Sequence, residues 1–252
     1  MNNIKVKILQ QNLNGMPLFL AKLTQRGSKI NNMSDLLSLY DDNINKTPSD
    51  GFMKLPHSTI FRMCHLTVAI YGLSTKAVSQ LRTHATRLTF MSTSTQYSEF
   101  TKLEAPYVIP EGLSEAQKKQ YIDACKKIHR AYIDLYESGV DRDKAGYLLP
   151  QSLKKCLVIH GNFPAWQYML SLRLCNRNTR EVQHICELIL QAINDECGKV
   201  WADQCLPNCL REGCKEGKFC CGKKYVDKRV QEKPIEETKD APVQEGECKE
   251  WK

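Results

Sequence analysis

The stretch Gln80-Leu-Arg-Thr-His-Ala-Thr-Arg-Leu-Thr-Phe-Met-Ser-Thr-Ser-Thr-Gln-Tyr97 places three basic side chains close together and follows them with a run of hydroxyls. The basic residues are Arg82, His84 and Arg87. Guanidinium groups donate forked hydrogen bonds to phosphate, and hydroxyls can complete the shell around it. The stretch is therefore a candidate for phosphate and pyrimidine recognition. From the spacing alone, a Ser- and Thr-rich surface loop is a slightly better interpretation of this stretch than a binding loop.

Patterns on either side of this stretch predict strands and helices. Ile4 to Leu9 alternates apolar and polar residues, and Leu66 to Tyr71 is rich in β-forming residues, so both segments are predicted to be strands. Ser114 and Gln117 form a capping box that opens a helix ending at Gly139. Further helices are predicted at Pro17–Leu23, Met33–Tyr40, Ser74–Leu81, Asp141–Tyr147, Ala165–Leu174 and Thr179–Glu196.

The composition is that of a globular chain with an excess of positive charge. Of 252 residues, 42% are hydrophobic, and 36 basic against 28 acidic residues give a net charge of +8. This charge suits an anionic ligand such as a nucleotide or a folate polyglutamate, and equally a nucleic acid. No secretion signal opens the sequence, and no stretch approaches the roughly 20 apolar residues of a membrane span. We therefore expect a cytoplasmic protein with reduced cysteines.

Ten of the twelve cysteines fall into two groups. Five are isolated among apolar neighbours and are expected to be small buried hydrophobes: Cys64, Cys125, Cys156, Cys175 and Cys186. Five others crowd a Gly- and Lys-rich stretch: Cys205, Cys209, Cys214, Cys220 and Cys221. Four thiolates can close a tetrahedral structural zinc site, although the usual Cys-x2-Cys pairs are missing. A zinc site and a set of free thiols both stay open at this point.

The end of the chain allows a second function class. The Cys-rich stretch also carries Lys215, Lys218, Lys223 and Lys224, a combination that favours a nucleic-acid-binding module. Only Phe219 and Tyr225 are available there for base stacking, so nucleic acid is the less expected partner. Beyond it, residues 226–252 are dense in charged residues, Gln and Pro, which predicts a disordered tail.

The opening stretch resembles the signature of the flavin-dependent thymidylate synthases. Gln80 and Arg82-Thr-His84 are similar to the start of that signature, which contains Gln and then Arg-His-Arg. Ser94-x-Gln96-Tyr97 is similar to its end, Ser-x-Arg-Tyr. Thr89 stands at the first Ser position, and the middle is one residue longer than in the family.

Three further motifs resemble the same family, in the family's order. His57-Ser-Thr-Ile-Phe61 is similar to its His-x-Thr-Pro-Phe element. Residues 139–150, from Gly139 to Pro150, resemble Gly-x-x-x-Glu-x-Ala-Arg-x-x-Leu-Pro. Asn162, Arg173 and Glu181 follow at the family's spacing. The resemblance spans roughly residues 4–196.

The resemblance implies a fold, a reaction and a set of partners. The fold is α/β, a mixed sheet flanked by helices, here with a Cys-rich C-terminal extension. Residues 1–200 would form the catalytic domain, 201–225 the extension with its candidate zinc site, and 226–252 the disordered tail. The family transfers a methyl group to dUMP with FAD, methylenetetrahydrofolate and NADPH, and it works as a homotetramer with shared active sites. The cofactor performs the redox chemistry, and the protein supplies orientation and electrostatics.

The resemblance also assigns roles to residues. His57, Arg82, His84, Arg87 and Asn162 would bind the flavin. The uracil and phosphate of dUMP would be bound by Ser94, Gln96 and Tyr97. Arg173 would face the pyrimidine carbonyls, where a fixed cation stabilises charge that develops on the ring. Ser94 and Arg173 are the expected catalytic residues.

Three departures concern cations of the family. Gln96, Gly146 and Pro164 stand where the family has arginine. Each hydrogen bond to a charged group is worth about 1.5–3 kcal/mol, so their loss weakens nucleotide binding unless other cations replace them. The candidates for this replacement are Arg87, Lys144, Lys154 and Lys155. The alternatives are another pyrimidine nucleotide, for example as a substrate for hydroxymethylation, or an inactive interaction subunit.

Overall fold

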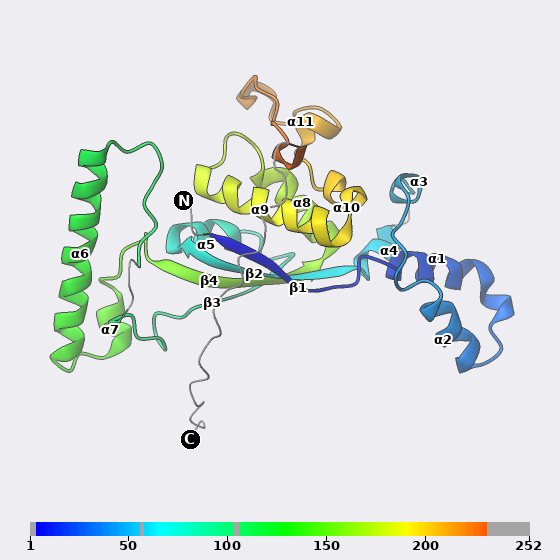
Figure 1. Ribbon diagram of the computed structural model, residues 1–252, viewed down its shortest axis with the longest axis horizontal. Helices are drawn as coiled ribbons and strands as arrows, with labels where there is room; N and C mark the ends of the chain where they lie inside the picture. Colours follow the sequence, from blue (N-terminus) through cyan, green and yellow to red (C-terminus); the bar gives the residue numbers. More distant parts are fainter. Residues whose placement is uncertain (1–3, 56–57, 103–105, 231–252) are drawn as a thin grey trace.

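A four-stranded sheet forms the centre of the computed structural model, which describes residues 4–55, 58–102 and 106–230 (Figure 1). The strands are β1 (Lys5–Gln11), β2 (His65–Ser74), β3 (Thr89–Ser92) and β4 (Lys154–Asn162), in the order β1-β2-β4-β3. All three pairings are antiparallel. The α/β class expected from the resemblance is confirmed, but the strand directions are not mixed.

Alternation of side chains gives the sheet one apolar face. In β2, Leu66, Val68 and Ile70 are buried, and the residues between them are not. In β4, Leu157 and Ile159 are buried on the same face as Lys155. This apolar face requires cover, and the helices that follow the strands provide it.

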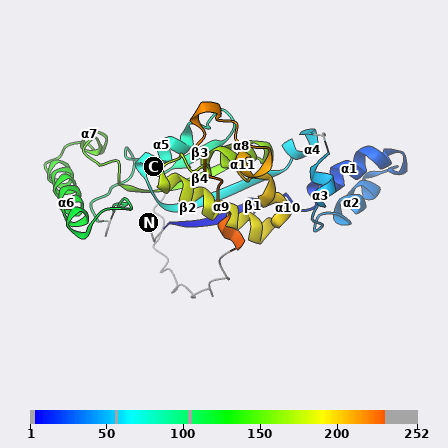
Figure 2. The same ribbon diagram turned by 90° about the horizontal axis from the view of Figure 1, so that it is seen from above.

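Within the part of the chain that the structure describes, the helices that cover the sheet lie on this face. Helices α5 (Thr75–Arg82), α8 (Phe163–Arg173), α9 (Arg180–Cys197) and α10 (Lys199–Gln204) lie on one side of the sheet (Figures 1 and 2). Trp166 and Trp201 are fully buried beneath them, in one continuous hydrophobic core. On the opposite face, Lys7, Ala69, Val158 and Met91 form a row across the four strands, and 71% of the Met91 surface is exposed.

Helical arms extend from both ends of the sheet (Figure 1). One arm contains α1 (Met16–Arg26), α2 (Met33–Asp41), α3 (Asp50–Met53) and α4 (Ser58–Arg62). The other contains the long helix α6 (Glu115–Glu137) and the short helix α7 (Arg142–Gly146). The predicted capping box at Ser114 and Gln117 is present at the start of α6. No described helix has the length and hydrophobicity that a membrane crossing requires.

The predicted helices are confirmed, whereas two strands differ from expectation. Strand β3 lies inside the stretch that the sequence presents as a loop, and its hydroxyl-rich residues 89–92 pair with β4. Strand β4 lies where no element is predicted. In the sequence, the two lysines at its start and its single glycine hide the alternation of apolar and polar residues. In the structure, buried residues alternate with half-buried or exposed ones along the strand.

The C-terminal extension packs against the main core. Helix α10 contains residue 200, the expected domain boundary, and its Trp201 and Ala202 belong to the core. Helix α11 (Asn208–Arg211) follows, and Tyr225 returns to the core with 4% exposure. The predicted disorder of the tail lies outside the described residues from position 231 onward.

One arginine fastens the end of the extension to α10. Only 7% of the Arg229 side chain is exposed, and its Nη2 atom lies 2.7 Å from Asp203 Oδ1 and 2.6 Å from Asp227 Oδ2. The Arg229 guanidinium holds the pKa of the Asp227 carboxyl below its ordinary value. Because Asp203 is on α10, this contact joins the end of the extension to the core.

Replacing Arg229 by Met should lower the free energy of unfolding by about 1–3 kcal/mol, because two carboxylates lose a buried partner. Arg130→Met provides the control, since the Arg130–Asp134 pair on α6 is exposed and should contribute less than about 0.5 kcal/mol. Urea denaturation of both variants measures the difference. Equal stabilities would show that the extension is not anchored by Arg229.

Candidate functional site

Four cations gather where α5, β3, β4 and α8 meet, and none of them has a carboxylate partner within the described ranges. They are Arg82, Arg87, Lys155 and Arg173. Elsewhere, by contrast, Arg177, Arg180 and Arg229 form ion pairs with acidic residues. Cations left without carboxylates make a region of positive potential that attracts anionic ligands.

Arg173 is held rigidly at the last turn of α8. Its Nε donates to His84 Nε2 at 2.9 Å, and its Nη1 donates to Asn178 Oδ1 at 3.1 Å. Its Nη2 donates to Gln80 O at 3.1 Å and to Thr83 Oγ1 at 2.7 Å. These bonds use four of the five N–H groups of the guanidinium. The remaining N–H, on Nη1, is available to a ligand.

His84 is a buried neutral histidine beside this guanidinium. Only 7% of its surface is exposed. Burial, then the charges of Arg173 and Arg87, lower the pKa of His84 from 6.5 to about 4. Since Nε2 accepts from Arg173, the ring proton lies on Nδ1. His84 therefore presents a neutral N–H donor at neutral pH.

Arg87 is positioned by an aromatic ring. Its guanidinium carbon lies 4.2 Å from the centroid of the Tyr168 ring, which also contacts His84 edge-on at 6.0 Å between ring centroids. Tyr168 is on α8, one turn before Arg173. The opening stretch and α8 therefore form one cluster, which contains His84 and Arg173.

Lys155 and Arg82 form the second half of the cation cluster. Lys155 is 5% exposed, its Nζ donates to Thr93 O at 3.2 Å, and the same atom lies 4.6 Å from the Phe100 ring centroid. Burial, and secondarily the charge of Arg82, lower the pKa of Lys155 from 10.5 to about 8. Arg82 itself donates from Nη2 to Ser92 Oγ at 3.0 Å.

The segment after β3 makes a tight turn beside α7. Ser94 Oγ accepts from the backbone N–H groups of Gln96 at 3.1 Å and Tyr97 at 3.3 Å. Gln96 and Tyr97 are exposed. A Cβ atom added to Gly146 on α7 would lie 3.3 Å from Thr95 O, so the glycine permits the close approach of this turn. Ser94 therefore shapes the turn, and its expected catalytic role stays a prediction.

Asn162 and His57 are the two remaining residues that the resemblance assigns to the flavin, and only Asn162 lies among the described residues. Asn162 ends β4, and its Oδ1 accepts from Ala165 N at 3.0 Å, which makes it the N-cap of α8. It therefore sets the direction of the helix that carries Tyr168 and Arg173. His57 lies outside the described residues.

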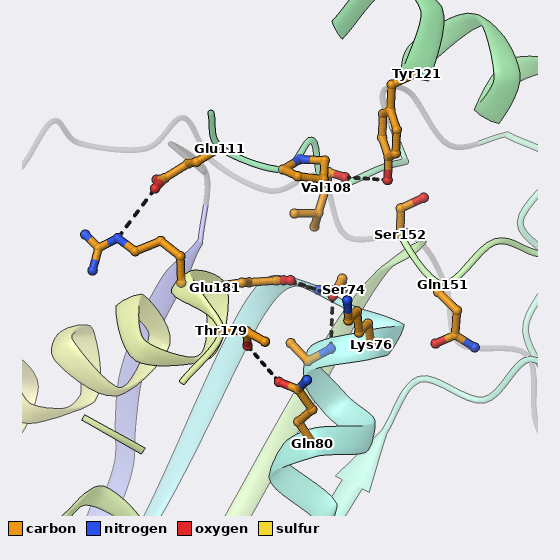
Figure 3. Close-up of a pocket in the computed structure, with 13 residues that line it drawn as sticks. Ser74, Lys76, Gln80, Val108, Glu111, Tyr121, Gln151, Ser152, Thr179 and Glu181 are labelled. Carbon is orange, nitrogen blue, oxygen red and sulfur yellow. Dashed lines mark hydrogen bonds and ion pairs between the residues drawn. The ribbon is translucent and has the colours of Figure 1, made fainter. Parts of the chain in front are cut away.

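Glu181 joins two helices beside a pocket of about 390 Å³ (Figure 3). Its carboxylate accepts from both the backbone N and the Oγ of Ser74, each at 2.7 Å, and thereby fixes the start of α5. On the same side, Thr179 Oγ1 donates to Gln80 Oε1 at 2.7 Å (Figure 3). The pocket also reaches Tyr121 of α6. Glu181 is a positioning residue for α5, the helix that ends in Arg82.

The cysteines are not assembled into a metal centre. Cys205 is buried, Cys209 is half-buried, and Cys214, Cys220 and Cys221 are exposed. Within residues 4–55, 58–102 and 106–230, no group of three or more His, Cys, Asp or Glu side chains is arranged to hold a metal ion. The structure thus gives the zinc interpretation no support.

The isolated cysteines match expectation with one clear exception. Cys64, Cys125 and Cys186 are buried as predicted, and Cys175 is half-buried. Cys156 is exposed, because it alternates with the buried residues of β4 and faces the side of the sheet without helices. The prediction of burial is therefore wrong for Cys156.

Two residues of the cluster were not singled out from the sequence for the positions they hold. The Tyr168 ring packs against the Arg87 guanidinium. In the sequence, Tyr168 is visible only as an aromatic residue in an apolar helix, which does not indicate this contact. Lys155 is among the candidate replacement cations, but its burial follows from the inward side of β4, a strand that the sequence pattern does not reveal. Of the other candidates, Lys144 is exposed on α7.

Comparison with known proteins finds related sequences. Residues 18–197 match the model of the family described as thymidylate synthase complementing protein. The flavin-dependent thymidylate synthase of Thermococcus kodakarensis is 27% identical over 226 residues, which cover 82% of this chain and 91% of that protein. The flavin-dependent thymidylate synthase of Geobacter sulfurreducens is 26% identical over 186 residues, which cover 72% of this chain and 78% of that protein.

Two solved structures have a similar fold. Thymidylate Synthase X (ThyX) from Helicobacter pylori, solved with FAD and dUMP, superposes with a TM-score of 0.59 at 17% identity, over 80% of this chain and 99% of that one. The UMP/dUMP methylase PolB from Streptomyces cacaoi, bound with 5-Br dUMP, has a TM-score of 0.57 at 19% identity, over 81% and 95% of the two chains. The expected fold is confirmed.

Replacing Arg173 by Met should raise the pKa of His84 from about 4 toward 6.5, because one of two neighbouring positive charges is lost. The wild-type contribution of His84 to stability is complete above pH 6.5 and is lost as the pH falls toward 4, since the unfolded chain binds the proton first. NMR titration of the histidine ring signals measures this pKa.

Arg177→Met is the control for this experiment, because Arg177 is paired with Glu216 of the extension rather than with His84. The His84 pKa should not change in that variant. A wild-type His84 that titrates near 6.5 would contradict the buried, cation-flanked environment.

Proposed function

Because this chain belongs to the family of thymidylate synthase complementing proteins, we propose that it converts dUMP to dTMP by reductive methylation, with methylenetetrahydrofolate as carbon donor and NADPH as reductant. The family resemblance and the enzyme class predicted from the sequence are confirmed by the family model and by relatives that are flavin-dependent thymidylate synthases. The individual substrates and the roles of single residues are our proposal.

The observation that carries this proposal is the set of cations without carboxylate partners. Arg82 and Arg173 lie at the ends of α5 and α8, Lys155 lies on β4, and Arg87 lies in the turn between α5 and β3. Arg173 contacts Thr83, the residue after Arg82, and Arg87 packs on Tyr168 of α8. A flavin dinucleotide, a nucleotide and a folate are all anions. Lys155 is buried and Arg173 is half-buried, whereas Arg82 and Arg87 are exposed. An anionic ligand offsets the charges of Lys155 and Arg173, which are costly to bury unpaired, and the exposed arginines are accessible to the same ligand.

The donor set also fits FAD. Arg87 is held by the Tyr168 ring and has no carboxylate partner in the described parts of the chain, so it can bind a phosphate of the cofactor. His84 offers a neutral N–H donor beside it. FAD, when bound, supplies the redox chemistry of the reaction. Arg87 and His84 hold it, and Asn162 sets the direction of α8.

Arg173 is the residue we propose to act on the nucleotide ring. Four contacts fix its guanidinium, so it does not reorganise when a ligand binds. A fixed cation of this kind stabilises negative charge as it develops on the pyrimidine carbonyls. Ser94, Gln96 and Tyr97 lie on the neighbouring turn and complete the nucleotide site in this proposal, with the Ser94 hydroxyl as the second catalytic group.

The substrate base and sugar are the open part of the proposal. Gln96 and Gly146 replace two arginines of the family, so recognition of the nucleotide differs here from the family's usual form. The fold neighbour PolB is described as acting on both UMP and dUMP. A related modification of another pyrimidine nucleotide, for example hydroxymethylation, is therefore the alternative that the same experiment examines.

We also propose a homotetramer. The opposite side of the sheet carries the row that ends at Met91, in which Lys7 and Met91 are exposed while Ala69 and Val158 are half-buried. It also carries Tyr71, which is 58% exposed, and the exposed Cys156. A face of this kind is suited to contact a second copy of the chain. Shared active sites would then form where subunits meet.

Mass spectrometry of the nucleotide product tests the proposed reaction. The purified chain should convert dUMP to dTMP when incubated with FAD, methylenetetrahydrofolate and NADPH, and light scattering of the same sample should give the mass of four 28.9-kDa chains. Arg173→Lys should lower kcat by at least about 10-fold, because the planar fork of contacts is lost while the charge remains.

A parallel incubation with UMP examines the substrate. Conversion of UMP alone, or a product heavier than dTMP by one oxygen atom, would replace the proposed substrate or product by the alternative. Unchanged dUMP and UMP together would contradict the proposed function. A single-chain mass would contradict the tetramer.

A further inference from the structure

Lys155 has a buried ammonium group, and no carboxylate among the described residues pairs with it. It is the second residue of β4 and points to the helix-covered face, in register with Leu73 of β2. Its surface is 5% exposed, which is rare for lysine because the charged head is usually left in water. A buried lysine lowers the stability of the fold unless a neighbouring group or a ligand offsets its charge.

The contacts of Lys155 offset this charge only in part. One N–H is used by Thr93 O, and the Phe100 ring faces the ammonium at 4.6 Å. An ammonium group has three N–H donors, so two stay available. No carboxylate pairs with it in the described ranges.

A second cation stands beside Lys155 rather than an anion. Arg82, at the last turn of α5, donates from Nη2 to Ser92 Oγ at 3.0 Å, and Lys155 donates to the carbonyl oxygen of the next residue, Thr93. Burial, and then the charge of Arg82, lower the pKa of Lys155. Two neighbouring positive charges repel each other, and an anion that lies between them offsets this repulsion. A dianion offsets both charges together.

The position of the pair indicates which anion this is. Thr93, which accepts from Lys155, directly follows β3 and precedes the turn at Ser94–Tyr97. Gly146 approaches the same turn at Thr95. The pair therefore lies beside the segment where Gln96 and Gly146 replace arginines. A cation from β4 and one from α5 can take over what the turn and α7 lack.

We propose that Lys155 and Arg82 bind the phosphate of the pyrimidine nucleotide in this chain. This inference rests on the proposed function for the identity of the nucleotide, and it assigns Arg82 to the nucleotide phosphate rather than to the flavin. The bound phosphate accepts hydrogen bonds from the two remaining N–H groups of Lys155 and from the forked donors of Arg82. The nucleoside itself contacts other residues, so its binding does not depend on the pair.

Calorimetric titration of the full chain with three ligands tests this assignment. The ligands are dUMP, deoxyuridine and inorganic phosphate. Lys155→Met and Arg82→Met should each weaken dUMP binding by about 10- to 100-fold, as the loss of a charged hydrogen-bond donor predicts, and should leave deoxyuridine binding unchanged. Lys155→Arg should restore most of the dUMP affinity, because it keeps the charge.

Lys119→Met is the matched control, since it removes one positive charge at an exposed position of α6. Its dUMP affinity should equal that of the wild type. Thermal unfolding of each variant identifies any that is not folded. If Lys155→Met is not folded, Arg82→Met carries the test, because Arg82 is exposed and the dUMP affinity of that variant should still fall by about 10- to 100-fold.

The outcomes separate this inference from the proposed function. Equal dUMP affinity in the wild type, Lys155→Met and Arg82→Met would overturn the phosphate site. An equal loss of dUMP and deoxyuridine binding would also overturn it, since the pair would then act on the structure of the whole site. If the wild type binds neither dUMP nor deoxyuridine, but binds inorganic phosphate through Lys155, the proposed function fails and the anion site stands.

Discussion

Positive charge that the chain does not neutralise is the constraint on which the site depends. Arg82, Arg87, Lys155 and Arg173 are drawn together by the packing of α5 and α8 on one face of the sheet. Within the described ranges their hydrogen bonds go to carbonyls, hydroxyls, an amide and an imidazole, and not to carboxylates. Each contact fixes a direction but leaves the charge in place. In the function we propose, the cluster is organised before a ligand arrives and an anion completes it.

The rest of the fold holds this cluster in position. Glu181 fixes the start of α5 through Ser74, and Asn162 fixes the start of α8. In the described part of the chain, helices α5, α8, α9 and α10 lie on one face of the sheet (Figure 1). The extension packs on the same side of the sheet, because Tyr225 and Arg229 join it to α9 and α10. One layer of helices thus serves both the core and the site.

The sequence predicts those parts of the molecule that have local signals. Ser74 and Ser114 predict helix starts, because each caps a helix through residues close to it in the chain. Both helix caps are present in the structure. The motifs assign His84 and Arg173 to different ligands, and the structure joins the two side chains directly, although they are distant in the chain. The sequence does not predict strands β3 and β4, because each pairs with residues that are distant in the chain. For the same reason it does not predict the role of Lys155, since only the alternation of burial along β4 shows that this lysine points inward. The assignments of Ser94, Gln96 and Tyr97 to the nucleotide stay predictions.

The most direct measurement of the central claim is a crystal structure of the chain with FAD and dUMP. The account predicts that the phosphate groups of the two ligands lie within hydrogen-bond distance of the four cations, with the dUMP phosphate at Lys155 and Arg82 and a phosphate of FAD at Arg87. It also predicts that Arg173 keeps its contacts to His84 and Asn178. Ligand phosphates bound elsewhere, with the four cations facing only water, would contradict it.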